Sequence, residues 1–232
     1  DEIHRVAHKY NIPIIEDAAE ALGSTYKGKA TGTFGRFGTI SFNGNKIITT
    51  SGGGALICQS KKEKERVIFL ATQARDDAPH YQHSQIGYNY RMSNILAGIG
   101  RGQMEVLEDR IIARRAMNSF YQNLFADING VEVFKEPSTD FYSNHWLSAI
   151  LIDSKVTGKT REDLLLAFLE DNIESRPLWK PMHLQPIFKN SPYYGSNVSE
   201  KLFENGLCLP SGSNLTDEDR FRISKVILNF FK

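Results

Sequence analysis

The short apolar run Ile12-Pro13-Ile14-Ile15, which ends in Glu16 and Asp17, is the feature that most restricts the fold. A run of this kind predicts a strand that is buried in a parallel sheet. In open α/β sheets, ligands bind at the carboxyl ends of the strands. The run therefore predicts an α/β fold whose ligand-binding edge carries the carboxylates of Glu16 and Asp17.

Helical and strand patterns continue along the rest of the chain. We expect helices at residues 1–10, 61–72, 93–128, 160–170, 196–205 and, after an N-cap at Thr216, at the C-terminus. We expect further strands at residues 39–42, 55–58, 131–134 and 146–152, and loops at residues 23–38 and 80–90. The pattern changes at Gly130, which predicts part of a large domain at residues 1–128 and a small α+β domain at residues 129–232.

Composition excludes several classes of protein. The 232 residues are 41% hydrophobic, and 28 Lys and Arg residues balance 27 Asp and Glu residues, so nothing favours binding to nucleic acid or to an anionic membrane. No apolar run approaches the ~20 residues that cross a bilayer. Cys58 and Cys208 fit no metal or redox spacing and are expected to be reduced thiols in the core. These features predict a soluble cytoplasmic protein.

Asp17 and Lys46 are the first candidate catalytic residues. A lone aspartate after a strand more often caps the next helix, but a buried carboxylate can also hold the proton of a cationic ring nitrogen. Most lysines are solvated surface charges. Lys46, however, follows a strand in the uncharged stretch Phe42 to Asn45 and precedes an apolar pair and the glycines Gly52 to Gly54. That context suits an amine that is directed into a site, where it attacks an aldehyde.

Two further segments carry polar groups. Ser41, with small neighbours, suits a phosphate contact, although a serine on a strand usually only packs. Gly87 to Asn94 places Asn89 and Arg91 among tyrosines before the N-cap candidate Ser93, which indicates either polar recognition or an ordered loop. In the C-terminal half, the segment from Arg176 to His183 suits either a nucleotide diphosphate and sugar or a proline-braced surface loop.

In order and spacing, five segments together resemble the DegT/DnrJ/EryC1/StrS sugar aminotransferases. They are residues 16–21, 35–42, 45–46, 49–54 and 87–93. The resemblance implies the aspartate aminotransferase fold (fold type I) and pyridoxal 5'-phosphate as the cofactor. It runs over essentially the whole chain and is strongest between residues 12 and 100.

The resemblance also implies roles for single residues. Lys46 would be the Schiff-base lysine and proton shuttle, and Asp17 would bind the pyridine nitrogen. Glu20 stands where many members have Gln, beside the ring hydroxyl. Ser41 would contact the cofactor phosphate, and Asn89 would reach the phosphate in a neighbouring subunit, so that a homodimer shares its active sites.

Within the family, residues 42–46 and 176–183 most resemble the branch that aminates nucleotide-linked 4-keto-6-deoxy-N-acetylhexosamines. The amino donor in this family is usually L-glutamate. Arg176, Lys180 and His183 are the candidate substrate-binding residues. Members of the family have a longer N-terminus, which carries a phosphate loop and an aromatic ring that stacks on the cofactor. The chain also opens inside a helix without Met, so we expect a missing N-terminal portion and an inactive 232-residue chain.

Three other functions compete with this interpretation. A sugar dehydratase of the same fold has histidine in place of the Schiff-base lysine, and Lys46 argues against it. A non-catalytic fragment with a binding or regulatory role would not depend on Lys46. A dinucleotide site is disfavoured because Gly52 to Gly54 does not open a helix after a strand. The six histidines show no zinc-binding spacing, so no metal site is expected.

Overall fold

The computed structural model describes residues 1–232, which form two compact units. The first unit comprises residues 1–110 and 138–144, and the second comprises residues 111–137 and 145–232. The boundary falls inside helix α4 (Leu107–Leu124), eighteen residues long, whereas sequence analysis placed the division at residue 128. How the folding domains divide stays a prediction, because compactness alone does not test independent folding.

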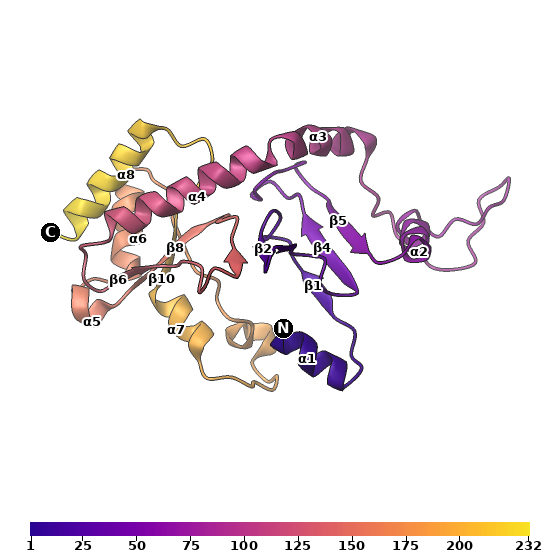
Figure 1. Ribbon diagram of the computed structural model, residues 1–232, viewed down its shortest axis with the longest axis horizontal. Helices are drawn as coiled ribbons and strands as arrows, with labels where there is room; N and C mark the ends of the chain where they lie inside the picture. The colour runs from indigo at the N-terminus through magenta and orange to yellow at the C-terminus, as the bar shows by residue number, and fades with distance from the viewer. The chain divides into compact units, whose positions relative to one another are not determined.

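The first unit contains two small sheets and three complete helices. The helices are α1 (Glu2–Lys9), α2 (Lys61–Ala71) and α3 (Asn94–Glu105). The strands of the larger sheet, in the order β1-β4-β5, are β1 (Ile15–Asp17), β4 (Phe37–Ser41) and β5 (Gly54–Cys58). The second sheet has the strand order β3-β2-β7. Its strands are β2 (Thr25–Tyr26), β3 (Lys29–Ala30) and β7 (Phe141–Tyr142). Figure 1 shows β1, β4 and β5 side by side.

Strand β1 confirms the predicted parallel pairing but not the predicted burial. It pairs with β4 in parallel, with Asp17 opposite Thr39. The strand begins only at Ile15, and the Ile15 side chain is 70% exposed. The physical reason is that β1 lies at the edge of its sheet and has a single neighbour, so its apolar run is not enclosed on both sides.

Two other expectations for the first unit need correction. The helix predicted at residues 93–128 is divided at Val106 into α3 and α4, although Ser93 caps α3 as predicted, its hydroxyl accepting from the Leu96 N–H at 3.3 Å. The loop predicted at residues 23–38 contains the short strands β2 and β3 and the first two residues of β4. Two-residue strands leave no alternation of apolar and polar residues to detect.

The second unit is built on a sheet of four strands in the order β6-β8-β10-β9. The strands are β6 (Val131–Val133), β8 (Ser148–Ile152), β9 (Arg176–Pro177) and β10 (Gly206–Leu209). The helices, besides the greater part of α4, are α5 (Ser154–Thr157), α6 (Arg161–Glu170), α7 (Val198–Asn205) and α8 (Asp217–Phe230). Two short 3-10 helices are η1 (Met182–Leu184) and η2 (Pro186–Phe188).

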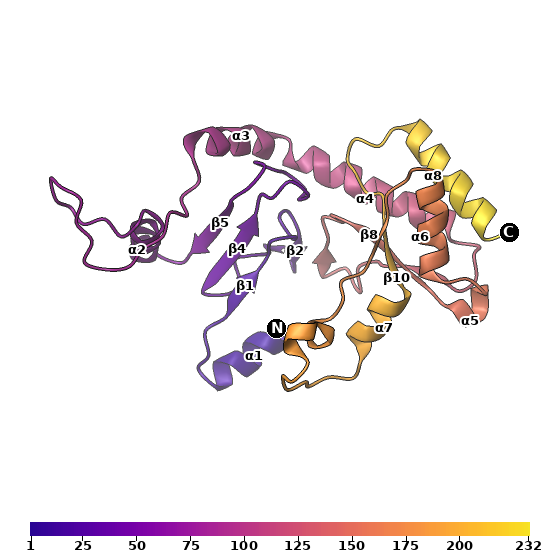
Figure 2. The same cartoon turned by 180° about the vertical axis from the view of Figure 1, so that it is seen from behind.

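The core of the second unit lies between this sheet and the helices α4, α6 and α8. Strand β8 alternates buried and half-buried residues, and its inward side chains Ile150 and Ile152 belong to the core. Figure 2 shows α6 and α8 lying side by side, and Phe168 of α6 and Ile227 of α8 are fully buried. Burying large apolar side chains in this way provides most of the stabilisation of a domain.

Helix α8 begins as predicted. Thr216 and Asp219 form a capping box, in which each side chain accepts from the other residue's backbone N–H. These hydrogen bonds from Thr216 lower the pKa of the Asp219 carboxyl below its ordinary value.

Neither cysteine forms a disulfide; Cys208 is buried on β10 and Cys58 is half-buried on β5. Among the helices, none combines the length and the apolar composition that crossing a membrane requires.

Candidate functional site

The carboxyl ends of β1 and β4 bring the first candidate residues together. Because the two strands are parallel, Asp17 at the end of β1 and Ser41 at the end of β4 lie at the same edge of the sheet. The Thr39 hydroxyl lies 3.4 Å from Asp17 Oδ1, and the Ala19 N–H donates to the same oxygen at 3.1 Å. Asp17 is exposed, so the buried carboxylate expected from the sequence is wrong for this chain.

A compact turn after β4 carries Lys46. The Lys46 N–H donates to the Asn43 carbonyl at 3.0 Å, and the Thr50 N–H returns to the Phe42 carbonyl at 3.0 Å. Ile47 and Ile48, directly after the lysine, are buried and fix the turn to the unit. Because backbone hydrogen bonds close this turn, Lys46 has fewer accessible conformations than a lysine on an open surface.

The Lys46 amine is directed to Glu20 in the turn that follows Asp17. Lys46 Nζ lies 2.8 Å from Glu20 Oε1, and the lysine side chain is only 12% exposed, whereas that of Glu20 is 47% exposed. Most lysines extend into solvent, so a nearly buried lysine held by one carboxylate is unusual. The sequence analysis named both residues but did not predict their direct contact.

The Glu16 carboxylate, which was expected at the ligand-binding edge together with Asp17, binds the backbone of the glycine-rich loop instead. Its two carboxylate oxygens accept from the Gly32 N–H at 2.6 Å and from the Phe34 N–H at 2.9 Å. A Cβ at Gly38 would lie 1.9 Å from the Gly32 carbonyl oxygen, so only glycine fits there. Glu16 therefore ties the glycine-rich loop to β1 beside the edge that carries Asp17.

Asn144 supports the turn that carries Glu20. Its side-chain amide donates to the Glu20 carbonyl at 2.9 Å and to the Leu22 carbonyl at 3.0 Å. Its backbone N–H donates to the Ser24 hydroxyl at 2.9 Å. Asn144 lies more than a hundred residues further along the chain than this turn, and no local pattern in the sequence reveals such a contact.

Asn89 lies in the segment that runs back along the end of α2. It forms an antiparallel bridge with Thr72, and the neighbouring Tyr88 N–H donates to the Leu70 carbonyl at 2.7 Å. The Asn89 side chain is exposed. Its predicted role at the cofactor of a neighbouring subunit stays a prediction.

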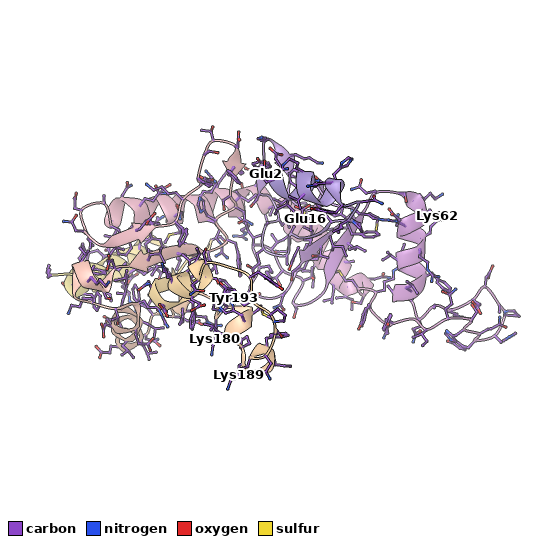
Figure 3. All side chains as sticks on the ribbon, turned by 90° about the horizontal axis from the view of Figure 1, so that it is seen from below. Glu2, Glu16, Lys62, Lys180, Lys189 and Tyr193 are labelled. Atoms are coloured by element: carbon purple, nitrogen blue, oxygen red, sulfur yellow. The ribbon has the colours of Figure 1, made fainter.

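The three candidate substrate-binding residues of the second unit have different surroundings. Arg176, on β9, pairs with Glu174, to which its Nε donates at 2.7 Å. Lys180 is exposed in the segment after β9, as Figure 3 shows. His183 lies in η1, and its Nε2 is 2.9 Å from Glu200 Oε1 on α7. Arg176 and Lys180 are thus both exposed, whereas the His183 side chain is only 17% exposed.

The groups at the edge of the first unit match what pyridoxal phosphate requires from a protein. An amine binds the aldehyde, a carboxylate keeps the ring nitrogen protonated, and a hydroxyl binds the phosphate. Lys46, Asp17 and Ser41 supply these three groups from adjacent elements. Their donor set therefore fits the cofactor.

Comparisons with known proteins agree with this chemistry. The DegT/DnrJ/EryC1/StrS aminotransferase family matches residues 1–228. The protein EpsN of Bacillus subtilis (strain 168), which is named as a pyridoxal phosphate-dependent aminotransferase, is 49% identical over 235 aligned residues. That alignment covers 100% of this chain and 60% of EpsN. GDP-perosamine synthase of Escherichia coli O157:H7 is 38% identical, with 100% of this chain and 62% of the relative covered.

Solved structures share the fold. A DegT DnrJ EryC1 StrS aminotransferase from Brucella abortus is 27% identical, with a TM-score of 0.86 over 99% of this chain and 60% of that one. The chain thus spans about 60% of the length of EpsN and of the Brucella protein. Because the family match extends over nearly all of the sequence, the chain belongs to the DegT/DnrJ/EryC1/StrS aminotransferase family.

Proposed function

We propose that this chain carries the Schiff-base lysine of a pyridoxal phosphate-dependent sugar aminotransferase. The whole protein transfers an amino group from L-glutamate to a nucleotide-linked 4-keto-6-deoxy sugar. The observation that carries the proposal is the nearly buried Lys46 amine, held 2.8 Å from Glu20 beside the strand end that bears Asp17. The proposal is made for the whole protein because the relatives are longer than this chain.

Each residue has one task in this proposal. Pyridoxal phosphate, when bound, supplies an aldehyde that condenses with amines and a ring that accepts an electron pair. Lys46 would hold the cofactor through its amine and, once the amine of the donor has displaced it, would move a proton at the donor's α-carbon. Asp17 holds the proton on the ring nitrogen, and Ser41 donates its hydroxyl to the phosphate. Glu20 orients the Lys46 amine.

The substrate assignment rests on the relatives' names and on the second unit. Two of the matched relatives are named for nucleotide-linked amino sugars, GDP-perosamine synthase and a transaminase for UDP-4-amino-4,6-dideoxy-N-acetyl-beta-L-altrosamine from Campylobacter jejuni. Lys180 and Arg176 are cations on exposed parts of the second unit. A cation of this kind binds the diphosphate that such substrates share.

We further propose that the active protein is a homodimer, in which Asn89 serves the partner's cofactor. Asn89 is exposed and its backbone is held against Thr72, so its side chain is available to a second subunit. We expect the 232-residue chain alone to be inactive, because Asp17 and Glu20 are exposed to water there.

Isotope transfer tests the function directly. The whole protein, loaded with pyridoxal phosphate, is incubated with nitrogen-15-labelled L-glutamate and with UDP- or GDP-linked 4-keto-6-deoxy sugars. The expected result is labelled amino sugar together with 2-oxoglutarate. A Lys62→Ala control, on exposed α2, should transfer label normally, whereas Lys46→Ala should not. A sugar that loses an oxygen without gaining nitrogen would contradict the proposal in favour of a dehydratase.

A further inference from the structure

The segment between β9 and α7, residues 178–197, has little regular structure of its own. It contains only the short helices η1 and η2, and most of its residues from 186 onward are exposed. It carries Trp179 and Lys180 at its start. An exposed segment without strand or helix partners keeps a fixed conformation only where side chains hold it.

His183 is the centre of the contacts that hold this segment. Its Nε2 lies 2.9 Å from Glu200 Oε1 on α7, and the two side chains are only 17% and 26% exposed. Its ring stacks on that of Tyr193, with 3.9 Å between the ring centroids and 27° between their planes. One histidine thus joins the two ends of the segment to a helix.

Tyr193 continues the same set of contacts. Its hydroxyl oxygen accepts from the Asn197 N–H at 3.2 Å, one residue before α7 begins. A Cβ at Gly195 would lie 2.5 Å from Tyr193 Oη, so the chain passes closely over the ring. Figure 3 shows Lys180, Tyr193 and Lys189 on this segment. We call His183, Tyr193 and Glu200 the His183 clasp.

The first part of the segment has its own attachments. Pro181 is buried, and the Gln185 side chain donates to the Lys180 carbonyl at 3.3 Å. The Trp179 and Trp146 rings are 6.1 Å apart. These contacts fix the backbone on one side of His183, and the clasp fixes it on the other side.

We propose that His183 is a positioning residue for the nucleotide sugar and does not contact it. The clasp holds the segment so that Lys180 meets the diphosphate with its side chain already in place. This inference rests on the proposed function, in which the substrate contains a nucleoside diphosphate. It differs from the assignment made from the sequence, because Glu200 and Tyr193 already contact the His183 ring.

The two roles of His183 predict different results for its neighbours. If His183 touched the substrate directly, changes at His183 would weaken binding without raising exchange at residues 182–197. If it positions the segment, Glu200→Ala and Tyr193→Leu should weaken binding in the same way, because each removes one contact of the clasp. His183→Gln should restore part of the loss, since its amide N–H still reaches a carboxylate.

Hydrogen exchange and nucleotide binding in the whole protein test the inference. Exchange of the amides at residues 182–197 is measured by mass spectrometry, and affinities for UDP and GDP are measured by titration. We expect His183→Ala, Glu200→Ala and Tyr193→Leu each to raise exchange there and to weaken nucleotide binding by about tenfold, as loss of one charged hydrogen bond does. Glu204→Ala, an exposed change on the same helix, should alter neither.

A kinetic comparison separates positioning from a general structural effect. The KM for the nucleotide sugar should rise about tenfold in the clasp variants, while the rate of the L-glutamate half of the reaction stays the same. Unchanged exchange at residues 182–197, or weaker binding in His183→Ala alone, would overturn the inference. So would tight UDP or GDP binding by all three variants, or no binding of either nucleotide by the natural protein. Exchange and nucleotide binding require no amino transfer, so failure of the proposed function is detected separately.

Discussion

Lys46 Nζ and Glu20 Oε1 lie 2.8 Å apart, although 26 residues separate them in the sequence. The contact joins the turn after β4 to the turn after β1, and so it links the two strand ends that carry the candidate site. The Glu20 carboxylate is half-exposed, while the lysine side chain is nearly buried. Glu20 therefore contacts the Lys46 amine from the side that faces solvent and orients it.

Replacing Glu20 tests that role. Glu20→Gln keeps an oxygen that accepts from Lys46, whereas Glu20→Ala leaves none. Loss of one hydrogen bond costs about 1 kcal/mol, which corresponds to a roughly fivefold change in a rate or an equilibrium constant. We therefore expect Glu20→Ala to slow the labelling of Lys46 by pyridoxal phosphate by at least that factor, and Glu20→Gln to slow it less. Equal labelling rates in both variants and the natural protein would show that Glu20 does not orient the amine.

Asp17→Asn tests the electrostatic part of the site. The amide cannot keep a proton on the ring nitrogen, so we expect amino transfer to fall by about 10²-fold or more. Lys46 should still be labelled, since the amine is held by Glu20. Asp127→Asn, at an exposed position, is the control and should keep full activity. The measurement is steady-state transfer alongside peptide mapping, and unchanged transfer in Asp17→Asn would remove this residue from the mechanism.

Glu16→Gln tests how the glycine-rich loop is held. The carboxylate accepts two N–H groups, and an amide can accept only one of them without placing its own N–H against the other. We expect a loss of about 1–3 kcal/mol in the free energy of unfolding. Glu2→Gln, on exposed α1, should change it by less than about 0.5 kcal/mol. Figure 3 labels both glutamates. Chemical denaturation measures the difference, and equal stabilities would contradict the account.

Tyr121→Phe tests the core of the second unit. The Tyr121 hydroxyl donates to the Pro210 carbonyl at 2.7 Å, and burial raises the pKa of the phenol above its ordinary value. Removing the hydroxyl leaves the half-buried Pro210 carbonyl without this donor, which costs about 1 kcal/mol. Tyr10→Phe, on the exposed end of α1, is the matched control. The midpoint of thermal unfolding should be clearly lower in Tyr121→Phe than in Tyr10→Phe. Equal midpoints would show that the Tyr121 hydroxyl does not contribute to stability.

His145 predicts how stability depends on pH. Burial lowers the pKa of His145 below its ordinary value, an effect that Glu136 opposes and Arg115 reinforces. The unfolded chain therefore binds the proton more readily than the folded protein. Stability is lost as the pH falls through the ordinary histidine range, by at most about 1.4 kcal/mol per pH unit for one proton.

The variant His145→Asn checks this sign. The backbone φ of His145 is +44°, a region that asparagine tolerates better than most residues. Between about pH 7 and pH 5, denaturant midpoints of the variant should fall less than those of the natural protein. His80→Asn, at an exposed position, is the matched control. A steeper fall in His145→Asn would contradict the direction assigned to the shift.

Local patterns in the sequence predicted most of the helices and the sheet edge that carries Asp17. Parallel strands end at the same edge, so once Ile15 to Asp17 and Phe37 to Ser41 are recognised as strands, their terminal residues are neighbours. The capping box at Thr216 was predictable for the same reason, because all its partners lie within three residues.

Contacts over longer distances along the chain could not be predicted from these patterns. Glu16 holds backbone N–H groups at Gly32 and Phe34, and Asn144 supports the turn at Glu20. His183 was assigned to the substrate, yet its partner is Glu200 on a helix that follows a segment without regular structure. Such partners depend on how loops close, which neither periodicity nor residue type determines.

Reductive labelling of Lys46 tests the central claim most directly. The whole protein is reduced with borohydride in the presence of pyridoxal phosphate, and its peptides are mapped by mass spectrometry. We expect one phosphopyridoxyl group on the peptide that contains Lys46, no group in Lys46→Arg, and normal labelling in Lys62→Ala. An unmodified Lys46 peptide, or a label that persists in Lys46→Arg, would contradict the assignment of Lys46 as the Schiff-base lysine.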